Sequence, residues 1–126
     1  GVALIADGRR QNGVGQNPGR KVGGVGAEIA LQPVSGLVQP IVPGASMRGA
    51  RPNGFGSLAD RTFQICAPND SVCDAPPNVS NALERAQGLI AANGVHAQYA
   101  SNSGVIDGTT ANQWVVGWAH QLIDGA

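Results

Sequence analysis

The sequence predicts the α/β fold class, with a mainly parallel sheet and helices on both of its faces. Residues 2–6 form an uninterrupted apolar run, which is typical of a strand buried on both faces of a parallel sheet. Residues 61–66 alternate between apolar and polar side chains and predict a second strand. Apolar positions at helical spacing follow in residues 81–92 and again after residue 109. Together these elements predict an α/β protein.

Composition limits the classes of function. The chain has 126 residues, which fits one domain at most. Its eight basic and eight acidic residues leave no net charge, so nothing indicates binding to nucleic acid or to an anionic membrane surface. The 19 glycines and eight prolines predict many turns, while the apolar content of 42% argues against a disordered chain.

The region between the two strands is predicted to hold little regular structure. Residues 8–26 are polar and glycine-rich without periodicity, and they predict a long loop. Residues 27–34 are expected to add a short strand or an extended segment, and residues 35–57 an irregular excursion whose apolar side chains pack on the core. Residues 23–26 do not fit a phosphate-binding motif and are expected to form a flexible turn. The basic side chains expected to face solvent are Arg9, Arg10, Arg20 and Lys21.

Two helices are predicted after the second strand. Ser80 is expected to cap the first helix, which covers residues 81–92 and ends at the C-cap signature of residues 93–94. Thr109 or Thr110 is expected to cap a final helix of about 14 residues. The apolar stripe of the final helix is expected to pack in the core, and it consists of Trp114, Val115, Trp118, Leu122 and Ile123.

The two cysteines, Cys66 and Cys73, stand close together in a loop-like segment. A close pair with no nearby histidine or third cysteine favours a disulfide over a metal site. Two unlinked buried thiols in a cytosolic protein are the alternative. A disulfide predicts an oxidising, exported location and a local bracing of the loop that it closes.

The first predicted strand requires neighbours that these residues do not supply. Two strands do not make an independently stable sheet with both faces buried. The sequence begins directly on an apolar run with no signal peptide before it, and its longest apolar runs are too short to span a bilayer. We therefore expect further residues before Gly1 in the complete protein.

Asp70 and His96 are candidates for acid–base chemistry. Asp70 lies in the turn after the second predicted strand, which is the usual position of the acid in α/β-hydrolases, and His96 follows it in the chain order of that fold. The acid would hold the imidazole in the right tautomer, and the histidine would take a serine proton and return it to the leaving group. The other histidine, His120, lies late in the final helix, where a cation suits the helix C-terminus. The structural alternatives are a loop aspartate that caps its own backbone and a surface histidine.

Three segments resemble cutinases and cutinase-like proteins, a family of serine esterases with the α/β-hydrolase fold. Residues 66–73 resemble the family's Cys-x3-Asp-x2-Cys segment, and residues 96–99 resemble its His-x-x-Tyr segment. Residues 1–10 are similar to the strand that follows the family's nucleophile helix. The similarity covers residues 1–10 and most of residues 60–126, and it is greatest to the larger mycobacterial and related actinobacterial cutinase-like lipid esterases.

The resemblance implies a three-layer α/β-hydrolase sandwich in which residues 1–126 are the C-terminal portion of a single domain. It implies that Asp70 is the acid and His96 the base of a catalytic triad, with Cys66 and Cys73 linked in a disulfide. No Gly-x-Ser-x-Gly motif occurs in the sequence. The nucleophilic serine is therefore expected in an N-terminal portion of the same protein, upstream of Gly1.

The function implied is serine-dependent hydrolysis of carboxylic esters through an acyl-enzyme, by a secreted or cell-envelope protein. The expected substrates are lipid-like, namely phospholipids, acylglycerols or thioesters. This mechanism requires no metal and no cofactor, and no nucleic-acid partner is expected. Two other functions remain open: a non-catalytic envelope-binding module that keeps the hydrolase shell without a nucleophile, and an acyltransferase that uses the same triad.

Overall fold

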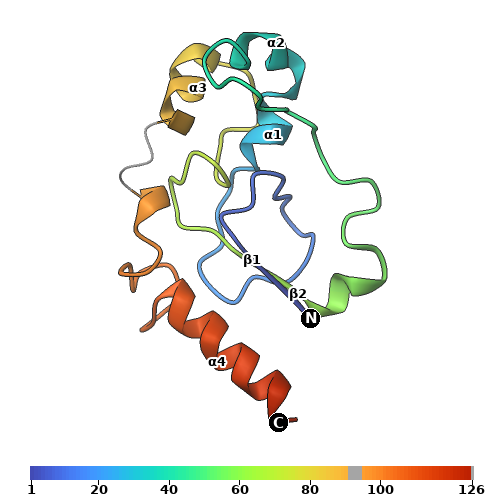
Figure 1. Ribbon diagram of the computed structural model, residues 1–126, viewed down its shortest axis with the longest axis vertical. Helices are drawn as coiled ribbons and strands as arrows, with labels where there is room; N and C mark the ends of the chain where they lie inside the picture. Colours follow the sequence, from blue (N-terminus) through green and yellow to red (C-terminus); the bar gives the residue numbers. More distant parts are fainter. Residues whose placement is uncertain (91–94, 126) are drawn as a thin grey trace.

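In the computed structural model, which describes residues 1–90 and 95–125, two strands lie centrally with helices at both ends (Figure 1). β1 (Val2–Ile5) and β2 (Thr62–Ile65) pair in parallel, with Val2 beside Thr62. The helices at one end are α1 (Ala27–Ala30), α2 (Ser35–Val38) and α3 (Ala82–Ile90), and α4 (Ala111–Ile123) lies at the other. The described residues also form the 3-10 helices η1 (Gln32–Val34), η2 (Gly56–Arg61) and η3 (Val95–Ala97).

Both predicted strands form, and their parallel pairing with helices around them is compatible with the α/β class. β1 ends one residue earlier than predicted because Ala6 adopts a left-handed backbone with φ of 58°. The expected burial on both faces is not met among the described residues, since all four residues of β1 are half-buried. The reason is that only β2 pairs with β1 in the part of the chain that the structure describes.

The prediction of a strand or extended segment at residues 27–34 is wrong. The segment forms α1 followed directly by η1. Alanine and glutamate favour helix, and Glu28 lies in the first turn, where a negative charge suits the helix N-terminus. Residues 35–57 are irregular as predicted, except for the single turn of α2 at their start and the first two residues of η2 at their end.

Residues 23–26, expected to be a flexible turn, are held between two other segments. Val25 and Ala75 exchange backbone hydrogen bonds, with N···O distances of 2.8 and 2.7 Å. A Cβ atom at Gly26 would collide with the backbone oxygen of Gly8, so glycine permits a close approach of two backbones there. Gly24 likewise leaves no room for a Cβ atom beside the backbone oxygen of Ala75, so these two glycines permit close packing.

Both predicted helices form. The first begins at Ala82, and the predicted cap Ser80 instead donates its hydroxyl to Oδ1 of Asn78. The predicted C-cap at residues 93–94 and the end of that helix at residues 91–92 lie outside the described residues. The final helix begins after Thr110, whose side chain forms a capping box with Gln113.

The core predicted for the final helix forms only in part. Trp114 and Trp118 pack on Phe63 of β2, with ring centroids 5.3 and 6.0 Å apart. Leu122 and Ile123, predicted in the same stripe, are 54% and 80% exposed. The reason is that α4 extends beyond the two-stranded sheet, where the described residues offer nothing to cover its last turn (Figure 1).

An ion pair holds the segment around Arg51 at the C-terminal end of β1. The carboxylate of Asp7 accepts from both terminal nitrogens of Arg51, at 2.6 and 2.8 Å. The guanidinium of Arg51 also lies 5.3 Å above the ring centroid of Phe55. Burial acts to raise the pKa of Asp7, but the hydrogen bonds from Arg51, the backbone N–H of Arg9 and the charges of both arginines outweigh burial and hold the pKa below its ordinary value.

Replacement of Asp7 by asparagine (Asp7→Asn) is expected to lower the free energy of unfolding by about 1–2 kcal/mol at neutral pH. A carboxyl group whose pKa folding lowers stabilises the fold above its unfolded-state pKa, and this contribution is lost as pH falls through the folded-state pKa. The difference between wild type and variant should therefore be full above about pH 4 and shrink on further acidification, which urea unfolding across pH measures.

The control for this prediction is Asp60→Asn, at an exposed aspartate in η2. It should change the free energy of unfolding by less than about 0.5 kcal/mol. An Asp7→Asn difference that stays constant from neutral pH to about pH 3 would contradict a stabilising Asp7–Arg51 pair.

Candidate active site

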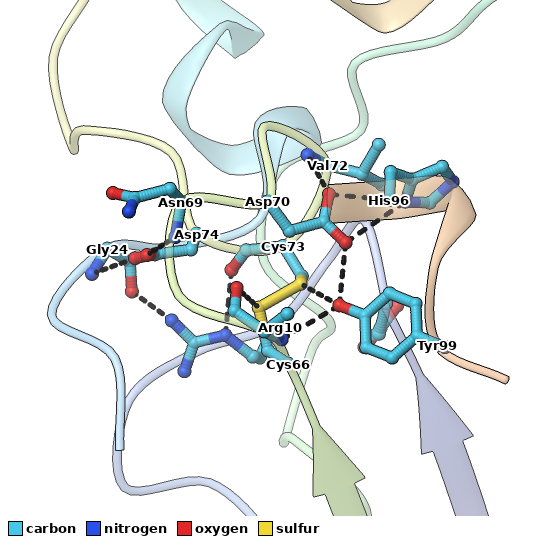
Figure 2. Close-up of a disulfide and its surroundings, with 12 residues drawn as sticks. Arg10, Gly24, Cys66, Asn69, Asp70, Val72, Cys73, Asp74, His96 and Tyr99 are labelled. Atoms are coloured by element: carbon cyan, nitrogen blue, oxygen red, sulfur yellow. Dashed lines mark hydrogen bonds and ion pairs between the residues drawn. A yellow bond between two sulfur atoms is a disulfide. The ribbon is translucent and has the colours of Figure 1, made fainter. Parts of the chain in front are cut away.

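The loop that carries Asp70 follows β2 directly and is closed by a disulfide. Cys66 and Cys73 are linked, with an S–S distance of 2.01 Å, which confirms the predicted pairing. Both cysteines are buried, and Asn69 adopts the left-handed backbone with φ of 68° that the tight turn requires. The turn points the Asp70 side chain inward, where it is 1% exposed (Figure 2).

The buried carboxylate of Asp70 is surrounded by hydrogen-bond donors. Oδ1 accepts from the backbone N–H of Val72 at 2.9 Å, and Oδ2 accepts from the hydroxyl of Tyr99 at 2.6 Å. Nδ1 of His96 lies 3.1 Å from Oδ1 and 3.0 Å from Oδ2. The two candidate residues, 26 positions apart in the sequence, are thus within hydrogen-bonding distance.

The hydrogen bonds around Asp70 leave its two oxygens directed at one ring nitrogen of His96. The backbone N–H of Val72 binds Oδ1, and the hydroxyl of Tyr99 binds Oδ2. Because a carboxylate only accepts hydrogen bonds, Nδ1 of His96 is the donor in a contact with the carboxylate form of Asp70, and Nε2 is the ring nitrogen turned away from the acid. The histidine side chain is 40% exposed, so the imidazole is held by a buried acid on one side and is open to a reactant on the other.

Arg10 was expected to face solvent, and that prediction is wrong. It is only 4% exposed, and its Nε donates to the carbonyl oxygen of Cys73 at 2.7 Å. Its terminal nitrogens donate to the carbonyl oxygen of Gly24 and to Oδ1 of Asn12. Burial lowers the pKa of Arg10, an effect that the charge of Asp74 opposes. The guanidinium group holds the disulfide loop to residues 12–24, since its planar donors can serve several carbonyl groups at once.

A hollow of about 500 Å³ lies next to the Asp70 loop, between α1 and α3. Its apolar lining includes Val72, whose backbone amide binds Asp70, together with Met47 and Leu89. Arg9, Glu28 and Arg48 add charge to its wall. Asp70 and His96 do not line the hollow, which meets the Asp70 loop at Val72.

The remaining candidate residues lie away from this pair. His120 is exposed in the last turn of α4, at the helix C-terminus as expected. Residues 1–90 and 95–125 hold no group of three or more histidine, cysteine or acidic side chains arranged to bind a metal ion. Within the same ranges, no helix has the length and apolarity needed to cross a membrane.

Two contacts of the site were not predicted from the sequence. The hydroxyl of Tyr99 reaches Asp70, although the only signal was its position in the His-x-x-Tyr segment. The guanidinium of Arg10 reaches Cys73 across 63 positions of sequence, and nothing local distinguishes it from its neighbour Arg9.

The chain is similar to a protein of named activity. No family model matches the chain. The chain is 66% identical over 124 residues to a protein of Corynebacterium glutamicum named "Carboxylesterase Culp6 homolog", and the match covers 98% of this chain but 40% of that protein. The chain thus spans about two fifths of the length of this curated relative, and it is over that span that it is similar to a carboxylesterase.

Proposed function

We propose that this chain supplies the acid and the base of a serine-type carboxylic-ester hydrolase, with Asp70 as the acid and His96 as the base. The observation that carries the proposal is the placement of Nδ1 of His96 within 3.1 Å of both oxygens of the buried Asp70 carboxylate. The 66% identity to a protein named as a carboxylesterase supports the same reaction class.

In the proposed mechanism, Nε2 of His96 takes the proton of a serine hydroxyl as its oxygen attacks the ester carbonyl carbon. The tetrahedral intermediate collapses, the bond to the alcohol breaks, and His96 gives its proton to the leaving alkoxide. Water then repeats these steps on the acyl-enzyme and releases the acid. Asp70 stabilises the imidazolium ion formed in each half of the reaction and keeps its ring oriented.

The serine is proposed to lie outside these residues, in an N-terminal portion of a longer protein. The sequence holds no Gly-x-Ser-x-Gly motif, and the relative extends well beyond the matched region. We propose that the complete domain is a three-layer α/β-hydrolase sandwich in which β1 gains a second neighbouring strand. The half-burial of all four β1 residues supports this arrangement.

The proposed substrates are esters with a lipid-like acyl group, such as phospholipids, acylglycerols or thioesters. The apolar part of the hollow beside Val72 supports an acyl chain as one of the groups bound. The disulfide supports an exported location, secreted or in the cell envelope, because such bonds persist in oxidising compartments.

The test uses the full-length gene product and a fluorophosphonate probe, which labels an activated serine. We expect one labelled serine, hydrolysis of acyl esters, and loss of both in His96→Asn. His120→Asn is the matched control, because it removes the other histidine of this chain and should leave labelling and hydrolysis intact. A wild-type protein that is neither labelled nor active on esters or thioesters would contradict the proposal. Product analysis with an added alcohol acceptor separates hydrolysis from acyl transfer.

A further inference from the structure

Tyr99 contacts both members of the acid–base pair. It is the only tyrosine of the chain and is 7% exposed. Its hydroxyl lies between the end of β2, the disulfide loop and the Asp70 carboxylate (Figure 2). The ring of Tyr99 also contacts the ring of His96 edge to face, with centroids 6.4 Å apart.

The direction of each hydrogen bond at Tyr99 follows from its partners. The backbone N–H of Ala67 donates to the hydroxyl oxygen at 2.8 Å, because an amide can only donate. The single hydroxyl proton is thereby available to Oδ2 of Asp70, at 2.6 Å. Sγ of Cys73, at 3.5 Å, belongs to a disulfide and carries no proton, so it does not compete as a donor.

The hydroxyl of Tyr99 stays protonated under ordinary conditions. Burial raises the pKa of Tyr99, and its hydrogen bond to the Asp70 carboxylate raises it further. The hydrogen bond from Ala67 acts in the opposite direction but does not cancel these effects. The protonated hydroxyl can donate to the carboxylate of Asp70.

We infer that Tyr99 is the positioning residue of the acid–base pair, an inference that deepens the proposed function and rests on it. Its hydroxyl fixes Oδ2 of Asp70, while the N–H of Val72 fixes Oδ1. With both oxygens fixed, the plane of the carboxylate is set toward Nδ1 of His96. Because Tyr99 lies only three residues after His96, the same anchor also sets the position of the base.

Loss of the hydroxyl would remove one of the two restraints on the carboxylate. Oδ1 of Asp70 would remain bound to the N–H of Val72. The carboxylate could then rotate about the Cβ–Cγ bond of Asp70 and turn away from His96. The N–H of Ala67 would lose its acceptor, which weakens the start of the loop as well. The expected effect is on orientation of the base during catalysis, not on affinity for substrate.

The test is Tyr99→Phe in the full-length protein, with kcat normalised to the folded fraction measured by tryptophan fluorescence. We expect kcat per folded molecule to fall about 10- to 100-fold, as for loss of a hydrogen bond to a charged group, with KM nearly unchanged. The downfield proton resonance of the His96 Nδ1–H group should shift or broaden in the variant. The resonance is assigned by its absence in His96→Asn.

Thr62→Val provides the matched control. Thr62 is fully buried in β2, and its hydroxyl donates to the carbonyl oxygen of Leu58 at 2.8 Å without contact with Asp70. Thr62→Val should lower stability as Tyr99→Phe does but leave kcat per folded molecule and the resonance unchanged. Unchanged kcat and resonance in Tyr99→Phe would overturn the inference, as would a loss of activity explained by a smaller folded fraction. If the wild type hydrolyses no ester, the proposed function fails, and the resonance alone decides the role of Tyr99.

Discussion

Replacement of Asp70 by asparagine (Asp70→Asn) is expected to lower kcat of the full-length protein about 10⁴-fold with little change in KM. The side chains have nearly the same shape, so the loop between Cys66 and Cys73 should keep its fold. The loss is expected because asparagine carries a donor in place of one of the two acceptors that Asp70 presents.

The geometry of the site explains why one acceptor is not enough. Val72 and Tyr99 each donate to one oxygen of Asp70, and His96 lies near both oxygens. In the variant, the new amide group must face one of these partners. Where it faces His96, it favours protonation at Nε2, and the imidazole then has no lone pair to accept the serine proton.

The matched control is Asp74→Asn, four residues later and just beyond the disulfide. The carboxylate of Asp74 accepts from the backbone N–H groups of Gly24 and Asn69, each at 2.8 Å, and makes no contact with His96. This variant should keep kcat while it loosens the loop. An Asp70→Asn protein that retains more than about a tenth of wild-type kcat would contradict the role of Asp70 as the acid.

Local sequence patterns predicted the elements that carry the site, because each depends on neighbours in the chain. The apolar run at the start gave β1, the alternation after Arg61 gave β2, and the threonine at position 110 capped α4. The same holds for the disulfide, whose two cysteines close a short loop. Residues 27–34 were mispredicted because a single helical turn has too few positions to show a period.

Contacts between distant segments could not be predicted from these patterns. Arg10 and Cys73 meet across 63 positions, and Asp7 and Arg51 across 44. Arg9 and Arg10 are the same residue type in the same loop, yet only Arg10 is buried. Which of them turns inward depends on where residues 24 and 73 present their carbonyl groups, and that is a property of the tertiary structure.

Removal of the disulfide is the change expected to destabilise the fold most. The double variant Cys66→Ser/Cys73→Ser should lose roughly 2–3 kcal/mol of unfolding free energy, since the bond closes a loop of seven-residue separation and restricts the unfolded chain. Urea unfolding followed by tryptophan fluorescence measures the change. The urea midpoint of wild type measured in a reducing agent should equal that of the variant. Equal midpoints for oxidised wild type and the variant would contradict the prediction.

The same variant separates the two ways in which the loop is held. Arg10 binds the carbonyl oxygen of Cys73 and Tyr99 binds Asp70, and neither contact uses a cysteine side chain as donor. If these contacts suffice to orient Asp70, the variant should keep most of its kcat per folded molecule. If the disulfide itself sets the turn around Asn69, kcat should fall together with stability. The Asp70 carboxylate would then no longer be oriented toward Nδ1 of His96.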